Sequence, residues 1–197
     1  MAKDTINCPP FPPLKWDGYF WTAEVTLPSW VGFQNRRGPY ASVSSRKPSD
    51  GTVRLSVAPL DDDARTPPTP EQVAAFQYLM ANEADVAAAV VKALVEYYPG
   101  EKEAYLDAYD EGEVEELPDV SDPSELRSLI GLSSVHVLAV THSGVAYIGF
   151  EFGCIWDSEH GAGVMTHRGR VVATGQADTS FLEWIAERDA ERNKRKA

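Results

Sequence analysis

Four apolar, β-branched runs separated by three turn signals occupy residues 135–174, and this pattern constrains the fold more than any other feature of the chain. The turn signals are polar, glycine-containing stretches at residues 141–144, 158–161 and 167–170. Short loops of this kind between β-branched runs are typical of hairpins, in which consecutive strands run antiparallel. Because the runs are almost continuously apolar, both faces of the strands are expected to be buried. The pattern predicts a four-strand antiparallel meander at the centre of the fold.

The N-terminal region predicts a further pair of strands. Residues 19–27 are rich in aromatic and β-branched side chains, as strands prefer, and residues 53–57 alternate between apolar and polar. Residues 1–15 precede them and contain four prolines, which fix the backbone dihedral φ and remove amide donors. We therefore expect an extended, proline-rich N-terminus that leads into an antiparallel strand pair.

A long helix is predicted between the strand pair and the meander. Its start is well marked, because Thr69 can cap the helix, Pro70 suits the first position and Gln72 completes a capping box. Apolar residues at helical spacing follow, and they are expected to pack into the core. The run is longer than an average helix, so a break is expected near Asn82, and Pro99 is expected to end it.

A C-terminal helix closes the predicted fold. Asp178 or Ser180 is expected to cap it, with Glu183 placed to complete a capping box. Residues 190–197 form a basic tail, and its lysines and arginines suit the negative end of a helix dipole. The side chains expected to face the core are Phe181, Trp184 and Ile185.

Together these elements predict a single α+β domain over residues 1–197, with an N-terminal strand pair, a long helix, an antiparallel four-strand meander and a C-terminal helix. A chain of 197 residues is long enough to bury a sizeable core. Residues 101–122 lie between the long helix and the meander, and they are expected to form an acidic loop or lid.

Negative charge is concentrated in residues 101–122. The stretch holds ten acidic residues and one base, Lys102, so it accounts for −9 of the net charge of −12. Such a field repels the phosphates of nucleic acid and attracts a cationic protein partner. The alternative is a solvated loop that only aids solubility. The candidate partner surface consists of four glutamates at the centre of the stretch, Glu111, Glu113, Glu115 and Glu116.

The sequence predicts a cytoplasmic protein that does not enter a membrane. The first residues lack the apolar stretch and cleavage site of a secretory signal, and every fully apolar run is far too short to span a bilayer. The two cysteines, Cys8 and Cys154, are too few for a disulfide framework, so we expect free thiols in a reducing compartment.

The second turn of the predicted meander carries the densest group of chemically active side chains. The carboxylates and imidazoles there offer oxygen and nitrogen ligands for a divalent metal ion. Cys154 offers a second chemistry, that of a nucleophilic thiol with His160 or His142 as its base. The candidate binding residues are Trp156, Asp157, Glu159, His160 and His167.

A structural role explains the same residues. Asp157 would accept backbone N–H groups in the turn, His160 would bond across the hairpin, and Gly161 with Gly163 would allow close approach of the backbone. Cys154 in a buried strand would serve as a small apolar residue. Because the chain contains none of the established catalytic or metal-binding motifs, we expect no catalytic residue, no metal and no cofactor.

The same segment carries a family resemblance. The run W-D-x-E-H-G-x-G-V at residues 156–164 and the run G-x-A-D-T at residues 175–179 are similar to segments of a family of uncharacterised bacterial cytosolic proteins. Residues 70–72 at the start of the long helix are also similar, so the resemblance covers residues 16–186. It implies a bacterial source and kinship with immunity-type proteins, which neutralise toxins.

These observations favour a non-enzymatic protein-interaction module, in the form of an immunity-type inhibitor of a cationic toxin. Its contact surface would be the acidic stretch. The alternative is a metal-binding protein or a metal-dependent hydrolase that uses the hairpin between Trp156 and His167.

Overall fold

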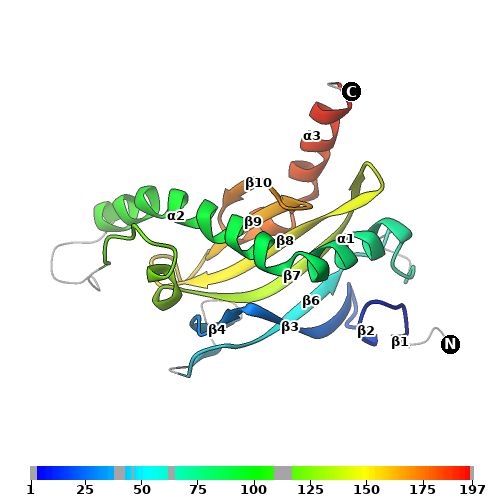
Figure 1. Ribbon diagram of the computed structural model, residues 1–197, viewed down its shortest axis with the longest axis horizontal. Helices are drawn as coiled ribbons and strands as arrows, with labels where there is room; N and C mark the ends of the chain where they lie inside the picture. The colour runs from blue at the N-terminus through cyan, green and yellow to red at the C-terminus, as the bar shows by residue number, and fades with distance from the viewer. Residues whose placement is uncertain (1–3, 38–42, 46, 62–64, 109–116, 196–197) are drawn as a thin grey trace.

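A computed structural model describes residues 4–37, 43–45, 47–61, 65–108 and 117–195, and it shows helices packed on a mixed β-sheet (Figure 1). The predicted α+β class is therefore confirmed. The strands of the main sheet are β1 (Thr5–Ile6), β2 (Leu14–Trp16), β3 (Trp21–Val31), β6 (Asp50–Val57), β7 (Ile130–His142), β8 (Val145–Cys154), β9 (Ala162–His167) and β10 (Arg170–Gly175). The helices are α1 (Pro70–Ala81), α2 (Glu83–Ala108) and α3 (Glu183–Lys194), with short 3₁₀ helices η2 (Glu125–Ser128) and η3 (Ala177–Ser180).

The main sheet has the strand order β1-β2-β3-β6-β7-β8-β9-β10, and β4 (Asn35–Arg37) pairs with β5 (Val43–Ser45) in a separate hairpin. Neighbouring strands of the main sheet are antiparallel except β6 and β7, which are parallel. A parallel pair needs a long crossover, which here contains α1 and α2. The N-terminal strand pair and the meander, predicted as separate groups, thus belong to one sheet. The proline-rich N-terminus is not merely extended, because β1 and β2 continue the sheet beyond β3.

The four strands of the meander are β7 to β10, which pair in chain order. The turn between β7 and β8 holds Ser143 at φ 49° and Gly144 at φ 74°. Two consecutive positive φ values match the right-handed twist of a hairpin, and glycine adopts them without a steric cost. Arg168 adopts φ 55° in the turn between β9 and β10. Both turns lie where the glycine-containing signals place them.

The long helix begins as predicted but continues further. Thr69 accepts the N–H of Gln72, and the Gln72 side chain accepts the N–H of Thr69, so the capping box is complete. Asn82 separates α1 from α2, at the expected break. The prediction that Pro99 ends the helix is wrong, because α2 runs on to Ala108 with Pro99 inside it. Tyr105 packs against the core in this last part, and this contact offsets the hydrogen bond that proline cannot make.

Helices cover both faces of the central strands. Phe76 of α1 and Leu94 of α2 join the larger apolar core on one face, together with Ile148 and Phe150 of β8. Tyr147, directly before Ile148 in the sequence, points to the other face and belongs to a smaller cluster under α3. The alternation along β8 follows from the two-residue period of a strand. Both faces of β8 are therefore buried, as its apolar run predicts.

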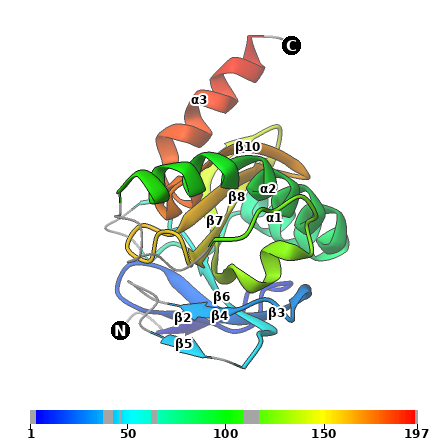
Figure 2. The same ribbon diagram turned by 90° about the vertical axis from the view of Figure 1, so that its left-hand side faces the viewer.

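The C-terminal helix differs from its prediction in start and orientation. Residues 178 and 180 lie in η3, and α3 begins only at Glu183, with Leu182 as its N-cap and no side-chain cap. The chain first crosses the sheet at η3, so the helix starts later than the capping residues suggest. The buried core residues of α3 are the small Ala186 and Ala190, and Ile185 packs against their cluster while it stays partly exposed. Phe181 and Trp184, predicted to face inward, are 45% and 54% exposed, and α3 projects from the body in both views (Figures 1 and 2).

Candidate functional site

Two segments that stand out in the sequence line one cavity. The β8–β9 loop contributes residues 155–160, and the last turns of α2 contribute residues 101, 104 and 105. The cavity has a volume of about 580 Å³, and we call it the acidic cleft. Its lining residues are Glu101, Ala104, Tyr105, Ile155, Trp156, Asp157, Ser158, Glu159, His160 and Gln176. The start of the acidic stretch and the W-D-x-E-H segment are therefore two walls of one site.

Asp157 holds the loop wall of the cleft in shape. Its Oδ1 accepts the backbone N–H groups of Glu159 at 3.2 Å and His160 at 2.8 Å, and the His160 Nδ1 lies 3.1 Å from Oδ2. Gly161 follows at φ 61°, and a Cβ there would overlap the carbonyl oxygen of Phe152. Asp157 thus accepts backbone N–H groups as expected, whereas His160 bonds within the turn and not across the hairpin. The turn leaves the side chains of Glu159 and His160 exposed.

Trp156 forms the buried base of the same loop. Its side chain is 4% exposed and meets the ring of Tyr98 edge to face at 5.0 Å. The strand β8 has already ended at Cys154, so Trp156 is placed by the loop and not by strand alternation. Its Nε1 is the only buried side-chain nitrogen or oxygen among the described residues that has no hydrogen-bond partner. Trp156 therefore stabilises the cleft from below, and the exposed residues of the loop form its surface.

The helical wall follows from the continuation of α2 beyond Pro99. Glu101 and Tyr105 are one helical turn apart, so they face the cleft together. Burial raises the pKa of the Tyr97 hydroxyl, and its hydrogen bond to Glu101 raises that pKa further. Lys102 pairs with Asp119 at 2.8 Å and is not among the residues that line the cleft. Glu101 and Tyr105 are not among the site residues predicted from the sequence. Extending the helical spacing of the long helix past Pro99 would have placed them on one face of it.

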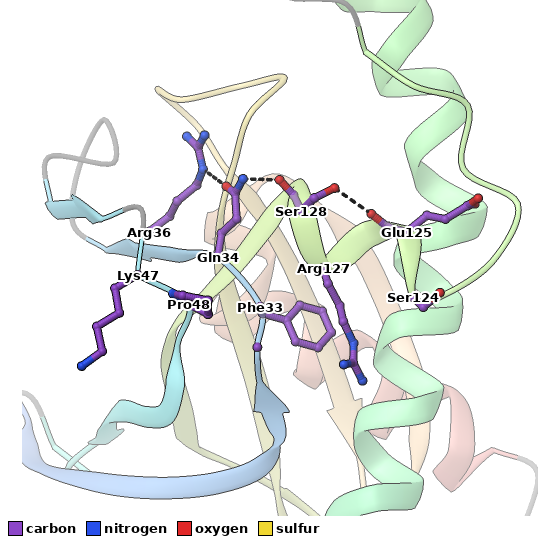
Figure 3. Close-up of a pocket in the computed structure, with 10 residues that line it drawn as sticks. Phe33, Gln34, Arg36, Lys47, Pro48, Ser124, Glu125, Arg127 and Ser128 are labelled. Carbon is purple, nitrogen blue, oxygen red and sulfur yellow. Dashed lines mark hydrogen bonds between the residues drawn. The ribbon is translucent and has the colours of Figure 1, made fainter.

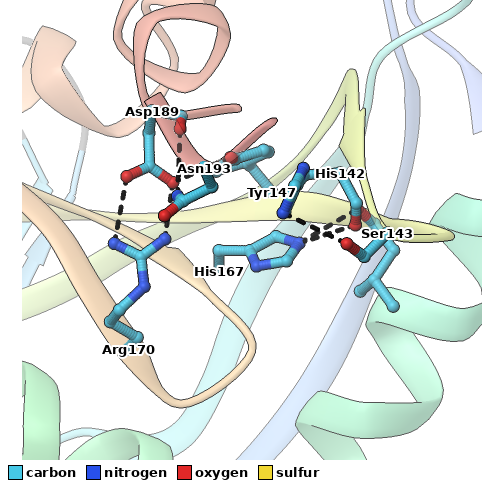
Figure 4. Close-up of polar contacts among 8 residues, drawn as sticks. His142, Ser143, Tyr147, His167, Arg170, Asp189 and Asn193 are labelled. Carbon is cyan, nitrogen blue, oxygen red and sulfur yellow. Dashed lines mark hydrogen bonds and ion pairs between the residues drawn. The ribbon is translucent and has the colours of Figure 1, made fainter. Parts of the chain in front are cut away.

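His167 lies apart from the other predicted site residues. It ends β9, whereas Asp157, Glu159 and His160 precede the start of that strand. Its Nε2 is 3.0 Å from the carbonyl oxygen of His142 and 3.3 Å from that of Val145, and its ring lies 4.6 Å from Tyr147 (Figure 4). The structure therefore does not bring His167 together with Asp157, Glu159 and His160, the residues considered with it as possible ligands of a metal ion. The described residues contain no group of three or more His, Cys, Asp or Glu side chains that could hold a metal ion.

His167 predicts a pH dependence of stability. Burial lowers the pKa of its imidazole below the usual 6.5, so the unfolded chain binds the proton more readily than the folded chain. The free energy of unfolding should therefore fall as the pH drops from about 7.5 through 6.5 towards 5, a range in which carboxylates stay ionised. Urea denaturation across this range measures the effect. His167→Gln should flatten the profile, whereas a wild-type profile flat between these values would contradict the prediction.

Cys154 is a structural residue. Its side chain is fully buried, and its thiol donates to the carbonyl oxygen of Asp157 at 3.2 Å. Burial raises the pKa of this thiol to about 12. The nucleophile is the thiolate, so a thiol with this pKa is unreactive at neutral pH. Neither His160 nor His142 is its hydrogen-bond partner, and the nucleophilic role considered for Cys154 finds no support in this geometry.

A second cavity, of about 480 Å³, lies where the β3–β4 turn, the segment before β6 and η2 meet (Figure 3). Sequence reasoning treats its β-side residues only as part of a turn-rich segment. Three cationic residues line it, Arg36, Lys47 and Arg127, together with the carboxylate of Glu125. The charged ends of Lys47 and Arg127 point to one side, and that of Arg36 points to the other. Glu125 is occupied by the backbone N–H groups of Ser121 and Asp122. The three cations therefore do not converge on one point.

The four glutamates of the predicted partner surface, Glu111, Glu113, Glu115 and Glu116, lie outside the described residues. The described flanks of this stretch are Ala108 at the end of α2 and Leu117, which is buried.

The comparisons place the chain in a family. None of the helices in the described part of the chain is long and apolar enough to cross a membrane. No curated protein and no solved structure shows significant similarity to the chain. Residues 21–182, which run from the first residue of β3 to the N-cap of α3, match a family described as a domain of unknown function, DUF6985. The matched region includes the sheet from β3 onwards, both long helices and the whole acidic cleft, and the chain belongs to this family.

Proposed function

We propose that the protein is an interaction module that binds a cationic segment of another protein in the acidic cleft. The observation that carries this proposal is the charge of the lining. Glu101, Asp157 and Glu159 contribute carboxylates, and the described residues that line the cleft include no lysine or arginine. A surface that gathers carboxylates attracts a partner of opposite charge. The acidic cleft therefore suits a lysine or arginine side chain.

The individual residues fit distinct parts of such a ligand. Glu159 is exposed and projects from a turn that Asp157 fixes, so its carboxylate is available to an incoming cation. Tyr105 adds an aromatic ring to the opposite wall, and cations are attracted to the faces of aromatic rings. The acidic stretch that continues from α2 would raise the local concentration of a cationic partner before contact. A concave site with charge on both walls binds a protruding basic segment better than a flat surface does.

An immunity-type inhibitor of a cationic toxin is the specific form of this function that we propose. An inhibitor of this class works by covering a basic active surface, and the acidic cleft provides carboxylates of the required sign. The alternative of a metal-dependent hydrolase has no comparable support, because His167 lies at the far end of β9 from the cleft.

The cleft predicts charge-dependent binding. Glu101→Gln with Glu159→Gln should weaken binding of an oligolysine peptide about three- to tenfold at low salt, since each exposed ion pair contributes about 0.2–1 kcal/mol. Fluorescence anisotropy of the labelled peptide measures the affinity. The matched control is Glu187→Gln with Glu191→Gln on the exposed face of α3, which removes the same charge elsewhere. Equal losses in the two double variants would show that only net charge matters, and the proposal would fail.

The acidic stretch makes a separate kinetic contribution. Replacing Glu111, Glu113, Glu115 and Glu116 with glutamine should slow association with the partner and flatten its salt dependence, because attraction is screened over a Debye length of about 8 Å at physiological salt. The melting temperature should hardly change, since solvated charges contribute little to stability. A pull-down from the source organism with wild type and variant identifies the partner. Recovery of the same partner with equal affinity at low and high salt would reduce the stretch to a solubilising segment.

A further inference from the structure

A third cavity lies between the last strand of the sheet and the C-terminal helix. It has a volume of about 510 Å³, and we call it the β10–α3 slot. One wall is formed by residues 172–174 of β10, and the other by residues of α3. Because side chains alternate between the faces of a strand, a cavity lined by three consecutive residues reaches the backbone edge of that strand. The slot therefore gives access to the main chain of β10.

The edge of β10 is open within the described part of the chain. The strand is the last in the sheet order and pairs with β9 alone. Proteins usually protect such an edge with lysine, proline or inward-pointing charges, because its unpaired N–H and C=O groups accept a further strand. After Arg170, β10 continues as Val171, Val172, Ala173, Thr174 and Gly175, which include no charge and no proline, and a register shift interrupts its pairing with β9 between Val171 and Ala173.

The helical wall of the slot carries an exposed tryptophan. Trp184 is 54% exposed, whereas Trp21, Trp30 and Trp156 are buried and Trp16 is partly buried. Leu182 and Ile185 lie beside it in the lining of the slot. A tryptophan that stays in contact with water costs free energy, and tryptophan is the residue most enriched at the centres of protein interfaces. Trp184 is therefore the residue of the slot on which an apolar side chain of a partner would pack.

Two arginines complete this wall. Arg188 and Arg192 follow Trp184 at intervals of one helical turn, so the three residues form a stripe along α3. Neither arginine has a carboxylate partner among the described residues. Asp189, between them in the sequence, is engaged elsewhere, since it accepts hydrogen bonds from Arg170 at 3.0 and 2.5 Å and from the Tyr147 hydroxyl at 2.8 Å (Figure 4). This network fixes α3 against the sheet. The lining of the slot also includes Asp178 of η3, and Arg188 and Arg192 are its two basic residues.

We infer that the β10–α3 slot binds an extended acidic segment of a partner protein, which adds as a strand to the edge of β10. The backbone of the segment pairs with residues 172–174, an apolar side chain packs on Trp184, and carboxylates pair with Arg188 and Arg192. An extended peptide at a sheet edge takes its affinity from main-chain hydrogen bonds and its specificity from alternate side chains. This inference goes beyond the acidic cleft, because it assigns a separate surface on which two arginines have no carboxylate partner among the described residues.

A peptide array tests the charge requirement. The probes are labelled peptides in which glutamate alternates with valine, leucine, phenylalanine or tyrosine, together with versions that carry glutamine in place of glutamate. The glutamate peptides should bind the full chain, and Arg188→Glu with Arg192→Glu should weaken their binding about tenfold or more. The matched control is Lys194→Glu with Arg195→Glu, which makes the same change in net charge outside the slot and should alter affinity less than about twofold. Equal losses in both variants, or no binding by any glutamate peptide, would overturn the inference.

N-methylated peptides test the added strand itself. Methyl groups on one set of alternate backbone nitrogens should abolish binding, because those nitrogens face β10, and methyl groups on the intervening set should leave binding nearly unchanged. If both sets bind alike, the peptide does not pair with β10. Trp184→Ala should also weaken binding while the melting temperature stays close to that of wild type. Glu101→Gln with Glu159→Gln should leave this peptide affinity unchanged, so failure of the acidic cleft and failure of the slot are distinguishable.

Discussion

Trp156→Ala should lower the free energy of unfolding by about 3–5 kcal/mol, the usual effect of removing a large aromatic side chain from a core. The indole is 4% exposed and packs edge to face on Tyr98, which is itself a buried residue of α2. Loss of the ring would leave a cavity between the β8–β9 loop and α2, the two walls of the acidic cleft. Chemical denaturation followed by circular dichroism measures the change.

Trp184→Ala is the matched control, because it removes the same side chain from a position that is 54% exposed. Its effect on the free energy of unfolding should stay within about 0.5–1 kcal/mol. Trp156→Phe keeps most of the apolar contact and removes the indole N–H that has no partner, so it should cost much less than the alanine variant. If Trp156→Ala leaves the denaturation midpoint unchanged, Trp156 does not hold the two walls together.

Gly149→Ala should destabilise the protein by about 3 kcal/mol, at the upper end of the range for overpacking a core. A Cβ at position 149 would overlap the carbonyl oxygen of Ser180, where η3 crosses β8. The obstacle is backbone and not the end of a flexible side chain, so the crossing segment would have to move away from the sheet. Thermal and urea denaturation of the variant measure the loss.

Gly100→Ala is the matched control for this change. Gly100 lies inside α2, and no atom lies within 4 Å of the Cβ that alanine would add. Alanine is a better helix former than glycine by about 0.5–1 kcal/mol, so this variant should be slightly more stable than wild type. If the Gly149→Ala protein is as stable as wild type, η3 does not pack closely against β8 at this position.

The parts of the fold that the sequence predicts well are determined by neighbours in the chain. The turn at Ser143 and Gly144 requires two positive φ values, and a glycine beside a short polar residue in the sequence predicts such a turn. The capping box of Thr69 and Gln72 is complete within four residues. Both signals act without any contribution from distant segments, which is why single-sequence reasoning finds them.

The parts that it misses depend on distant segments. The parallel pairing of β6 with β7 leaves no local mark in either strand, so the N-terminal strands are predicted as a separate group. Pro99 indicates a helix end, but contacts between Tyr105 and the core outweigh its local preference. The exposure of Trp184 cannot be predicted from the sequence either, because an aromatic residue at helical spacing is normally buried.

The candidate site is predicted in part for the same reason. The turn around Asp157 is local, and its residues do line a cavity. His167 lies only seven residues after His160, but a strand of six residues spans roughly 20 Å, so closeness in sequence becomes separation in space. Glu101 and Tyr105 enter the site only because α2 continues past Pro99.

The parallel junction between β6 and β7 has a consequence for how the chain folds. Arg54 lies opposite Ser134 across this junction, so the pairing closes a loop of about eighty residues. The hairpins of β7 to β10 close loops of only a few residues, and contacts between near neighbours in the chain form faster than contacts between distant ones. We therefore expect the meander to form early and the parallel pairing of β6 with β7 to form late. On this expectation, closure of the long loop between β6 and β7 limits the rate of folding.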